Sequence, residues 1–376
     1  MDCNQVFVSK VKRLIVVFTL LVAFLSVKID AFAQVDSAVV PVDSVVAESA
    51  EAVSGEHGSV KKEEEKFEPT KVIMEHIADS HMWHLWGHTS LPLPVILYTP
   101  SGIEVFSSEN FHHGEHDYTG SFHTYRLDED HVKVIGTDGK VDETASASIL
   151  DFSITKNVAS MFVAIAVILI LFISVANTYK KRIGKAPKGL QSFMEPIIVF
   201  VRDDIAKPNI GHNYAKFMPY LLTVFFFILI NNLFGLIPIF PGGANVTGNI
   251  TLTFVMAVGT LIIVNINGNK YYWKHIFKPD VPLWLYPIMI PVELIGIISK
   301  PFALMVRLFA NITAGHIIVL SLISLIFIFE TLAIAPVSVA FVLFMDVLEL
   351  LVAFLQAFIF TLLTALFIGM AVEEHH

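Results

Sequence analysis

Cysteine is almost absent from this chain of 376 residues. Its single cysteine, Cys3, leaves no partner for a disulfide and too few thiolates for a cysteine-based metal site. Charged residues are also scarce, at 16% of the sequence, and the basic ones flank apolar runs instead of forming a patch with interleaved aromatics, so nucleic-acid binding is not expected. The sequence contains no P-loop and no catalytic triad, so nucleotide chemistry is not expected of this chain on its own.

Apolar residues are abundant, at 55% of the chain, and several runs of them are long enough to span a membrane. The net charge of −9 hides two different parts. Residues 34–152 carry 22 Asp and Glu against 7 Lys and Arg, which leaves the rest of the chain positively charged. We therefore expect an acidic soluble segment joined to a membrane body with basic loops.

The first 33 residues have the pattern of a secretory signal peptide. Lys10, Lys12 and Arg13 precede an apolar run over residues 14–25, and the small residues Ala31 and Ala33 supply a cleavage site before position 34. An uncleaved membrane anchor is the alternative. Cleavage would place the mature N-terminus outside the cytoplasm.

Residues 34–150 divide into two parts. Residues 34–69 are acidic and have no periodic apolar face, so we expect a disordered tether. Residues 70–150 are expected to form a small α+β extracytoplasmic module. One hairpin is predicted from strands 93–98 and 103–106 around a Pro-Ser-Gly turn, and another from 132–135 and Val141 around Asp138-Gly139.

Histidines are concentrated in this module. His81, His84 and His88 would share one side of a helix, and three more histidines lie at 112, 113 and 116. Imidazoles spaced in this way can converge on zinc, but no second ligand pair stands at a recognised spacing. Metal binding is thus a weak hypothesis beside a surface or packing role, and no cofactor is expected.

The remainder, residues 151–376, is predicted to be an all-α polytopic membrane domain. Basic residues at 180–182, 185 and 188, and again at 270, 274 and 278, follow two of its apolar runs and mark cytoplasmic loops. Both clusters give one topology, in which the first span runs inward and the C-terminus is cytoplasmic. About five spans are expected, near residues 157–177, 217–240, 250–267, 288–329 and 331–372.

The last two of these spans are too long to stand upright. Residues 288–329 would form a helix of about 63 Å, against a hydrocarbon core of about 30 Å. A long, strongly tilted helical hairpin is the expected solution. Pro336 lies near the turn between its helices.

One arginine stands in the middle of this apolar hairpin. Arg307 carries a permanent charge, and placing it at the centre of a membrane helix costs about 2.5–3.5 kcal/mol or more unless a counter-charge or a wet cavity receives it. It is therefore the first functional candidate.

The residues around Arg307 carry a family resemblance. The ten residues from 307 to 316, R-L-F-A-N-I-T-A-G-H, together with Glu293 before them and Gln356 after them, closely resemble the arginine signature of subunit a of F-type ATP synthases. The resemblance covers about residues 151–376. It implies a proton-translocating stator that is no enzyme on its own, in a bacterial inner membrane. The implied partners are a ring of c subunits, peripheral-stalk b subunits, the lipid bilayer and, indirectly, the F1 head.

Helical geometry separates the polar residues of the hairpin by face. At about 100° per residue, Arg307, Asn311 and Gly315 share one side of their helix, while His316 lies about 180° from Arg307. Glu349 and Gln356 share a side of the last helix, with Asp346 one turn before Glu349. Gln356 is thus predicted to meet the stripe near Arg307.

The resemblance also suggests roles for these residues. It assigns His316 and Glu349 to an outer half-channel and Glu293 to a cytoplasmic one. In the common bacterial pattern the acidic residue follows the arginine and the histidine lies in the last helix, and here the two are exchanged. Asn311 and Gln356 have a plainer alternative as helix-packing groups.

Two other functions remain open at this stage. A proton-coupled secondary transporter could use Arg307 for an anionic substrate, although such folds usually contain internal repeats and none is found here. An assembly factor or metal-binding protein would depend on the N-terminal module alone. Ion choice and ring size are not encoded in any feature of this chain.

Overall fold

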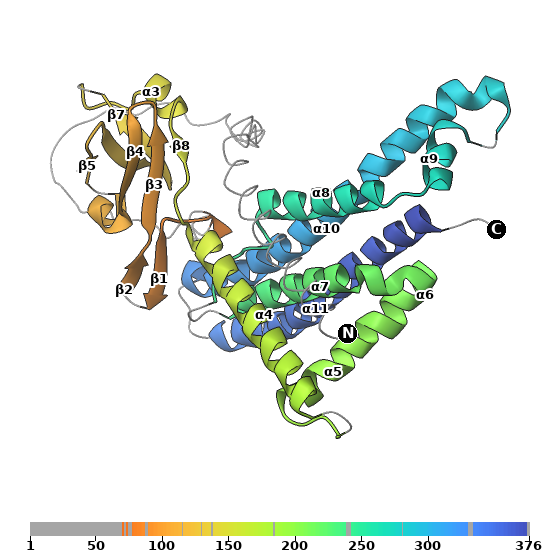
Figure 1. Cartoon of the computed structure of the whole chain (residues 1–376). Helices are drawn as coiled ribbons and strands as arrows, with labels where there is room; N and C mark the ends of the chain where they lie inside the picture. Colours follow the sequence, from red (N-terminus) through yellow and green to blue (C-terminus); the bar gives the residue numbers. More distant parts are fainter. Residues whose placement is uncertain are drawn as a thin grey trace.

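The computed structural model describes residues 70, 73 and 77–373, apart from positions 87–88, 115, 129, 137, 183–184, 238–241, 280 and 330–333. The predicted signal peptide and the predicted tether over 34–69 lie outside the described residues. The described chain forms a small β-rich module followed by a helical body, and the module lies at the N-terminal end of helix α4 (Figure 1). The expected all-α polytopic body with a small α+β module is confirmed.

The module contains three small antiparallel sheets. β1 (Met82–Trp86) pairs with β2 (Thr89–Pro92), and β3 (Pro94–Thr99) lies between β4 (Gly102–Ser107) and β8 (Leu150–Asp151). The third sheet has β6 (Thr124–Asp128) between β5 (Tyr118–Thr119) and β7 (His131–Ile135). A 3-10 helix, η1 (Ser108–Gly114), and the short helix α3 (Glu143–Ala147) complete it.

The predicted hairpin over 93–106 is confirmed, since β3 and β4 pair in register with Tyr98 opposite Ile103. Side chains of β3 point alternately to the two faces of the sheet. Val95 and Leu97 therefore lie on one face, in a buried core with Phe111 and Tyr125.

The second predicted hairpin is present: after β7 the chain reverses, with the N–H of Gly136 donating to the carbonyl of Lys140 at 2.8 Å and the N–H of Asp142 donating to the carbonyl of Val134 at 2.9 Å. β7 pairs along its length with β6, and Val141 makes only an isolated bridge to Ile135.

The body contains four described helices that are long and apolar enough to cross a membrane, or five if the bent pair α8 and α9 counts as one span. The helices are α4 (Lys156–Lys181), α5 (Leu190–Phe200), η2 (Val201–Ala206), α6 (Lys207–Ile210), η3 (Gly211–Asn213), α7 (Tyr214–Leu236), α8 (Ile250–Ile266), α9 (Lys270–Phe277), η4 (Leu283–Leu285), α10 (Tyr286–Phe329) and α11 (Ala335–Val372). η2 is a π-helical segment.

Helix α7 is the centre of the body. Its residues from Phe217 to Asn232 are all buried and mostly apolar, as expected for a helix surrounded by others. It packs against α4 and α11, while α10 packs against α8 and α11. The side of α11 that faces this core is rich in small residues, which lets the helices approach closely. At Gly369 an added Cβ would collide with the backbone carbonyl of Asn209 at the end of α6.

α10 and α11 run side by side as an antiparallel hairpin (Figure 1). With 44 and 38 residues they measure about 66 and 57 Å, at about 1.5 Å per residue. Because the hydrocarbon core is only about 30 Å thick, the hairpin must tilt steeply if both helices stay within the bilayer.

Candidate functional site

Arg307 lies on the exposed side of α10, in the middle of the long hairpin. Ala303, Ala310 and Ala314 are exposed beside it, at the spacings that put residues on one helical face. Within the part of the chain that the structure describes, no carboxylate lies at ion-pair distance from the guanidinium group. A fixed positive charge therefore stands on a surface of small side chains, where another helix can approach closely.

Asn311, one turn after Arg307, connects α10 to α11. Its amide Nδ2 donates to Oε1 of Gln356 at 3.0 Å. Gln356 is buried, whereas Asn311 is exposed on the same face as Arg307. The structure thus brings together two of the residues that sequence analysis singled out and sets them one turn from the arginine.

Glu349 is buried where α11 crosses Gly315 of α10. A Cβ added at Gly315 would collide with the Glu349 carboxylate, so the glycine makes room for that group. Asp346 lies one turn earlier on α11 and is exposed. Sequence analysis placed Gly315 on the face of Arg307, but the structure buries it against Glu349 while Arg307 is exposed. A glycine that accommodates a distant side chain has no signature in sequence.

His316 follows Gly315 and points in another direction, toward α7. Its Nε2 lies 3.5 Å from the position that a Cβ would take at Gly235, near the C-terminal end of α7. The predicted separation of Arg307 and His316 onto different sides of α10 agrees with this contact. Glu349 therefore contacts α10 at Gly315, the residue immediately before His316.

A polar group of residues lies near the end of α7 that His316 contacts. Sequence analysis favoured helix packing over channel lining for Asn231 and Asn232, and it did not single out Thr247. Thr247, in the loop before α8, donates its hydroxyl to Oδ1 of Asn232 at 2.7 Å, and Nδ2 of Asn232 donates to the carbonyl of Ala353 on α11 at 3.2 Å. Thr313 on α10 donates to the carbonyl of Gly248 at 3.5 Å. These bonds join the loop to α7 and to the middle parts of α10 and α11.

Glu293 lies near the other end of α10, half-buried and facing α9. One of its carboxylate oxygens is 4.0 Å from Nδ1 of His275 on that helix. Glu293 is 14 residues before Arg307, about 21 Å along the helix axis. Along α10 the order is therefore Glu293, Arg307, His316, with the arginine between the two other groups.

The histidines proposed as weak metal candidates do not share a helix. His84 belongs to strand β1, so the predicted helical spacing is wrong, and His88 lies outside the described residues. The aromatic and hydrophobic residues of Met82–Trp86 favour a strand instead. Among the described residues no group of three His, Cys, Asp or Glu side chains is arranged to hold a metal ion.

His81 is buried and pairs with Asp151, with 3.3 Å between Nε2 and Oδ2. Burial alone would lower the pKa of His81, but the hydrogen bond and the charge of Asp151, with Asp79 and Asp130, outweigh burial and raise it. Burial acts against the Asp151 carboxylate too, yet its bonds to His81 and Ser153 hold its pKa below the usual value. Each partner thus favours the charged form of the other, and the pair joins the two ends of the module.

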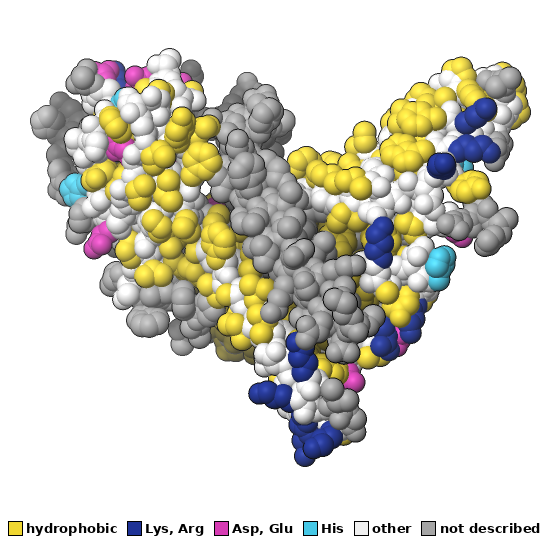
Figure 2. All heavy atoms as spheres, in the orientation of Figure 1, with side chains coloured by type: hydrophobic (Ala, Val, Ile, Leu, Met, Phe, Trp, Pro, Cys, Tyr) yellow, Lys and Arg dark blue, Asp and Glu magenta, His cyan; other side chains and the backbone are white. Residues whose placement is uncertain are grey.

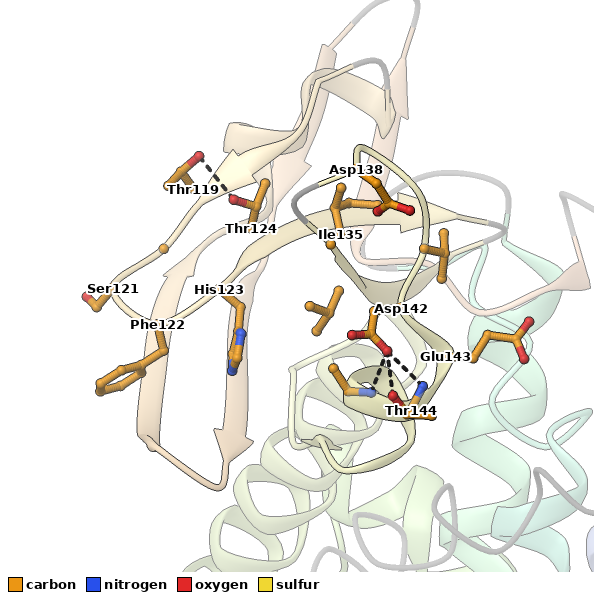
Figure 3. A pocket seen from close by; sticks show the side chains of 15 residues that line it. Thr119, Ser121, Phe122, His123, Thr124, Ile135, Asp138, Asp142, Glu143 and Thr144 are labelled. Carbon is orange, nitrogen blue, oxygen red and sulfur yellow. Dashed lines mark hydrogen bonds between the residues drawn. The ribbon is translucent and has the colours of Figure 1, made fainter.

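A hollow in the module surface lies between the β5–β6 turn and α3 (Figure 3). Thr119, Phe122 and His123 line one side, and Asp138 and Asp142 lie on the other. Asp142 is already used as the N-cap of α3, accepting from the backbone N–H groups of residues 144 and 145. In Figure 1 the strands and the helix α3 that line this hollow lie in the module, apart from the α10–α11 hairpin, and the hollow shares no residue with the site around Arg307.

Comparison with known proteins places both parts of the chain. A family model described as ATP synthase A chain matches residues 158–369, and one described as a domain of unknown function matches residues 72–152. ATP synthase subunit a of Chlorobium phaeobacteroides strain DSM 266 is 40% identical over 98% of this chain and 95% of its own length. The subunit a proteins of Chloroherpeton thalassium and Myxococcus xanthus are 52% and 42% identical, each over 60% of this chain and over 69% and 75% of their own lengths. The chain therefore belongs to the family of ATP synthase subunit a.

Proposed function

We propose that this chain is the proton-translocating stator of a rotary ATP synthase, with Arg307 as its essential charge. The observation that carries the proposal is that Arg307 is exposed on α10 without a described ion-pair partner. A charge at such a site needs a partner from outside the chain. The carboxylates of a rotor ring, passing one after another, supply such a partner.

The mechanism follows from the charge states that a rotor carboxyl group can adopt. Facing lipid, the group must be neutral, because an ionised carboxylate in hydrocarbon is too costly. Facing Arg307, it can release its proton, since a nearby positive charge favours the ionised form. Arginine suits this role because it keeps its charge where a lysine would lose its proton.

Two separate proton paths would meet the ring on either side of Arg307. The outer path uses His316 and Glu349, with the polar wall of Asn232 and Thr247 beside them. The cytoplasmic path uses Glu293, next to His275. Because Arg307 stands between these groups along α10, protons cannot pass directly from one path to the other and must be carried by the ring. Each proton that crosses the membrane releases about 2.3 kcal/mol per 100 mV of membrane potential.

The orientation rests on charge. Lys180, Lys181 and Arg182 end α4, and Lys270 and Lys274 lie on α9, all on parts of the body away from the module, where most basic side chains gather (Figure 2). The positive-inside rule makes that side cytoplasmic and the module extracytoplasmic. Peripheral-stalk b subunits and the F1 head would then bind from the cytoplasmic side.

The test uses the whole complex in sealed membrane vesicles. Arg307→Ala and Arg307→Lys should abolish ATP synthesis driven by a proton gradient, while the complex still co-purifies. Arg202→Ala is the matched control: Arg202 pairs with Asp203 at 2.7 Å, and losing an exposed pair worth about 0–1 kcal/mol should change little. Near wild-type synthesis by assembled Arg307→Ala complexes would overturn the proposal.

A further inference from the structure

The module is fastened to the membrane body at the start of α4. Asp79 accepts a hydrogen bond from the backbone N–H of Asn157 at 3.0 Å, and the N–H of Lys156 donates to the carbonyl of Ser80 at 2.8 Å. Thr155, the N-cap residue of α4, makes no side-chain cap of its own. The segment before β1 thus caps a membrane helix that lies almost 80 residues further along the chain.

A second fastening reaches the loop between α7 and α8. The indole N–H of Trp83, a buried residue of β1, donates to the carbonyl of Gly242 at 3.3 Å. Gly242 sits where an added Cβ would collide with the carbonyls of Phe234 and Ile237, and Gly243 has a φ of +77°. The chain therefore turns back tightly onto the end of α7, in a conformation that favours glycine.

The same loop continues into the polar group beside His316. From Gly242 it passes to Thr247, which bonds Asn232, and to Gly248, whose carbonyl accepts from Thr313 on α10. Asn232 in turn bonds Ala353, one turn after Glu349 on α11. A continuous set of hydrogen bonds and one short loop thus connect the module to both helices of the hairpin.

We propose that the N-terminal module supports the outer proton path, and that Trp83 is a positioning residue that holds the α7–α8 loop against Asn232 of α7 and Thr313 of α10, three residues before His316. This role rests on the proposed function of the hairpin. It gives a purpose to residues 72–152, whose family match carries no function. Rigid support is what such a path requires, because proton transfer between groups depends on their spacing.

The test compares two variants that each remove one polar hydrogen from an aromatic residue of the module. Trp83→Phe removes the indole donor, whereas Tyr98→Phe removes a hydroxyl from an exposed ring on β3. In the assembled complex, amide hydrogen exchange of residues 243–249 should rise about three- to tenfold in Trp83→Phe, as expected for one lost hydrogen bond. Proton-driven ATP synthesis should fall with it, and Tyr98→Phe should match the wild type in both measurements.

Unchanged hydrogen exchange in Trp83→Phe, or faster exchange with unchanged ATP synthesis, would contradict the proposal that the module supports the outer proton path. Should Trp83→Phe fail to assemble, Asp79→Ala decides the question, since it loosens the other fastening and should raise exchange in the same loop. Arg307→Ala run in parallel separates the two proposals. If Arg307→Ala abolishes ATP synthesis while Trp83→Phe and Asp79→Ala behave as wild type, the stator role is supported and the supporting role of the module is contradicted.

Discussion

The module and the membrane body solve opposite burial problems. The module hides Val95, Leu97 and Phe111 inside and carries most of its charged groups outside. The body instead exposes residues such as Ile170 and Val347 and hides polar ones in its core. Figure 2 shows apolar side chains spread over the outer surface of the helices. The surrounding solvent explains the difference, since lipid accepts apolar groups and leaves polar groups to pair within the protein.

The same comparison shows why one arginine matters and another does not. Arg126 in the module is exposed, pairs with Asp117 at 2.6 Å and stands among other charges, which is ordinary for a water-facing surface. Arg307 is exposed as well, but on an apolar helix and without a described ion-pair partner. Exposure in water needs no explanation, and exposure of a charge on a lipid-facing helix does.

After the loss of Arg307, the largest expected effect in the membrane body comes from Gly315. A methyl group there must push the Glu349 carboxylate aside, and displacing a reacting group by about 1 Å can cost on the order of 100-fold in rate. Gly315→Ala should therefore lower proton-driven ATP synthesis about 10- to 100-fold while the complex still assembles. The measurement is synthesis per assembled complex in vesicles.

Gly296→Ala is the matched control on the same helix. Nothing lies within 4 Å of a Cβ at Gly296, so this variant should keep wild-type synthesis. Equal activities in the two glycine variants would show that Glu349 does not depend on the space at Gly315.

A smaller effect is expected at the Asn311–Gln356 bond. Hydrogen bonds between membrane helices average about 0.6 kcal/mol in double-mutant cycles. Asn311→Ala and Gln356→Ala should each destabilise the hairpin, Gln356→Ala more because its side chain is buried, and the double variant should lose less than the sum. Unfolding of the purified chain in detergent measures these losses, and strict additivity would mean that the two side chains act independently.

The smallest effect is expected in the module, at His81 and Asp151. Because the pKa of His81 is raised, its protonation stabilises the fold. This stabilisation is fully present below about pH 6.5, the usual pKa of histidine, and is lost as the pH rises through the raised pKa. Because the pKa of Asp151 is lowered, its ionised carboxylate stabilises the fold above about pH 3.9, the usual pKa of aspartate. This stabilisation is lost only as the pH falls through the lowered pKa. Resistance of the module to protease should therefore decline from pH 5.5 to 8.5 in the wild-type chain.

His81→Gln removes the titrating group and should flatten this pH dependence. The variant keeps a polar side chain of similar length at the same position. An equally steep decline in His81→Gln would assign the pH dependence to other groups.

Sequence alone predicted much of the membrane body and less of the module. The lengths of the two apolar runs already required a tilted hairpin, and helical angles separated Arg307 from His316. The packing of Gly315 against Glu349 and the bond from Thr247 to Asn232 were not predictable, because they join residues 34 and 15 positions apart through tertiary structure.

The module shows where local patterns mislead. The spacing of His81, His84 and His88 suggested a helix, but the residues between them belong to strand β1. Strand β6 was missed because it is only five residues long and Tyr125 is its only buried residue, so it carries little hydrophobic periodicity. Short strands depend on their neighbours more than helices do, so their sequences predict them less well.

The most direct test of the central claim is cross-linking from the Arg307 face of α10. The single native cysteine, Cys3, is first replaced by serine. One cysteine is then introduced at Ala310 or at Ala314, or, as a control, at Phe302, which is about 140° away from Arg307 around the helix. A second cysteine beside the ion-carrying carboxylate of the rotor subunit completes the pair. We predict disulfides to the rotor from positions 310 and 314 and none from 302, and cross-linking from 302 alone would contradict the account.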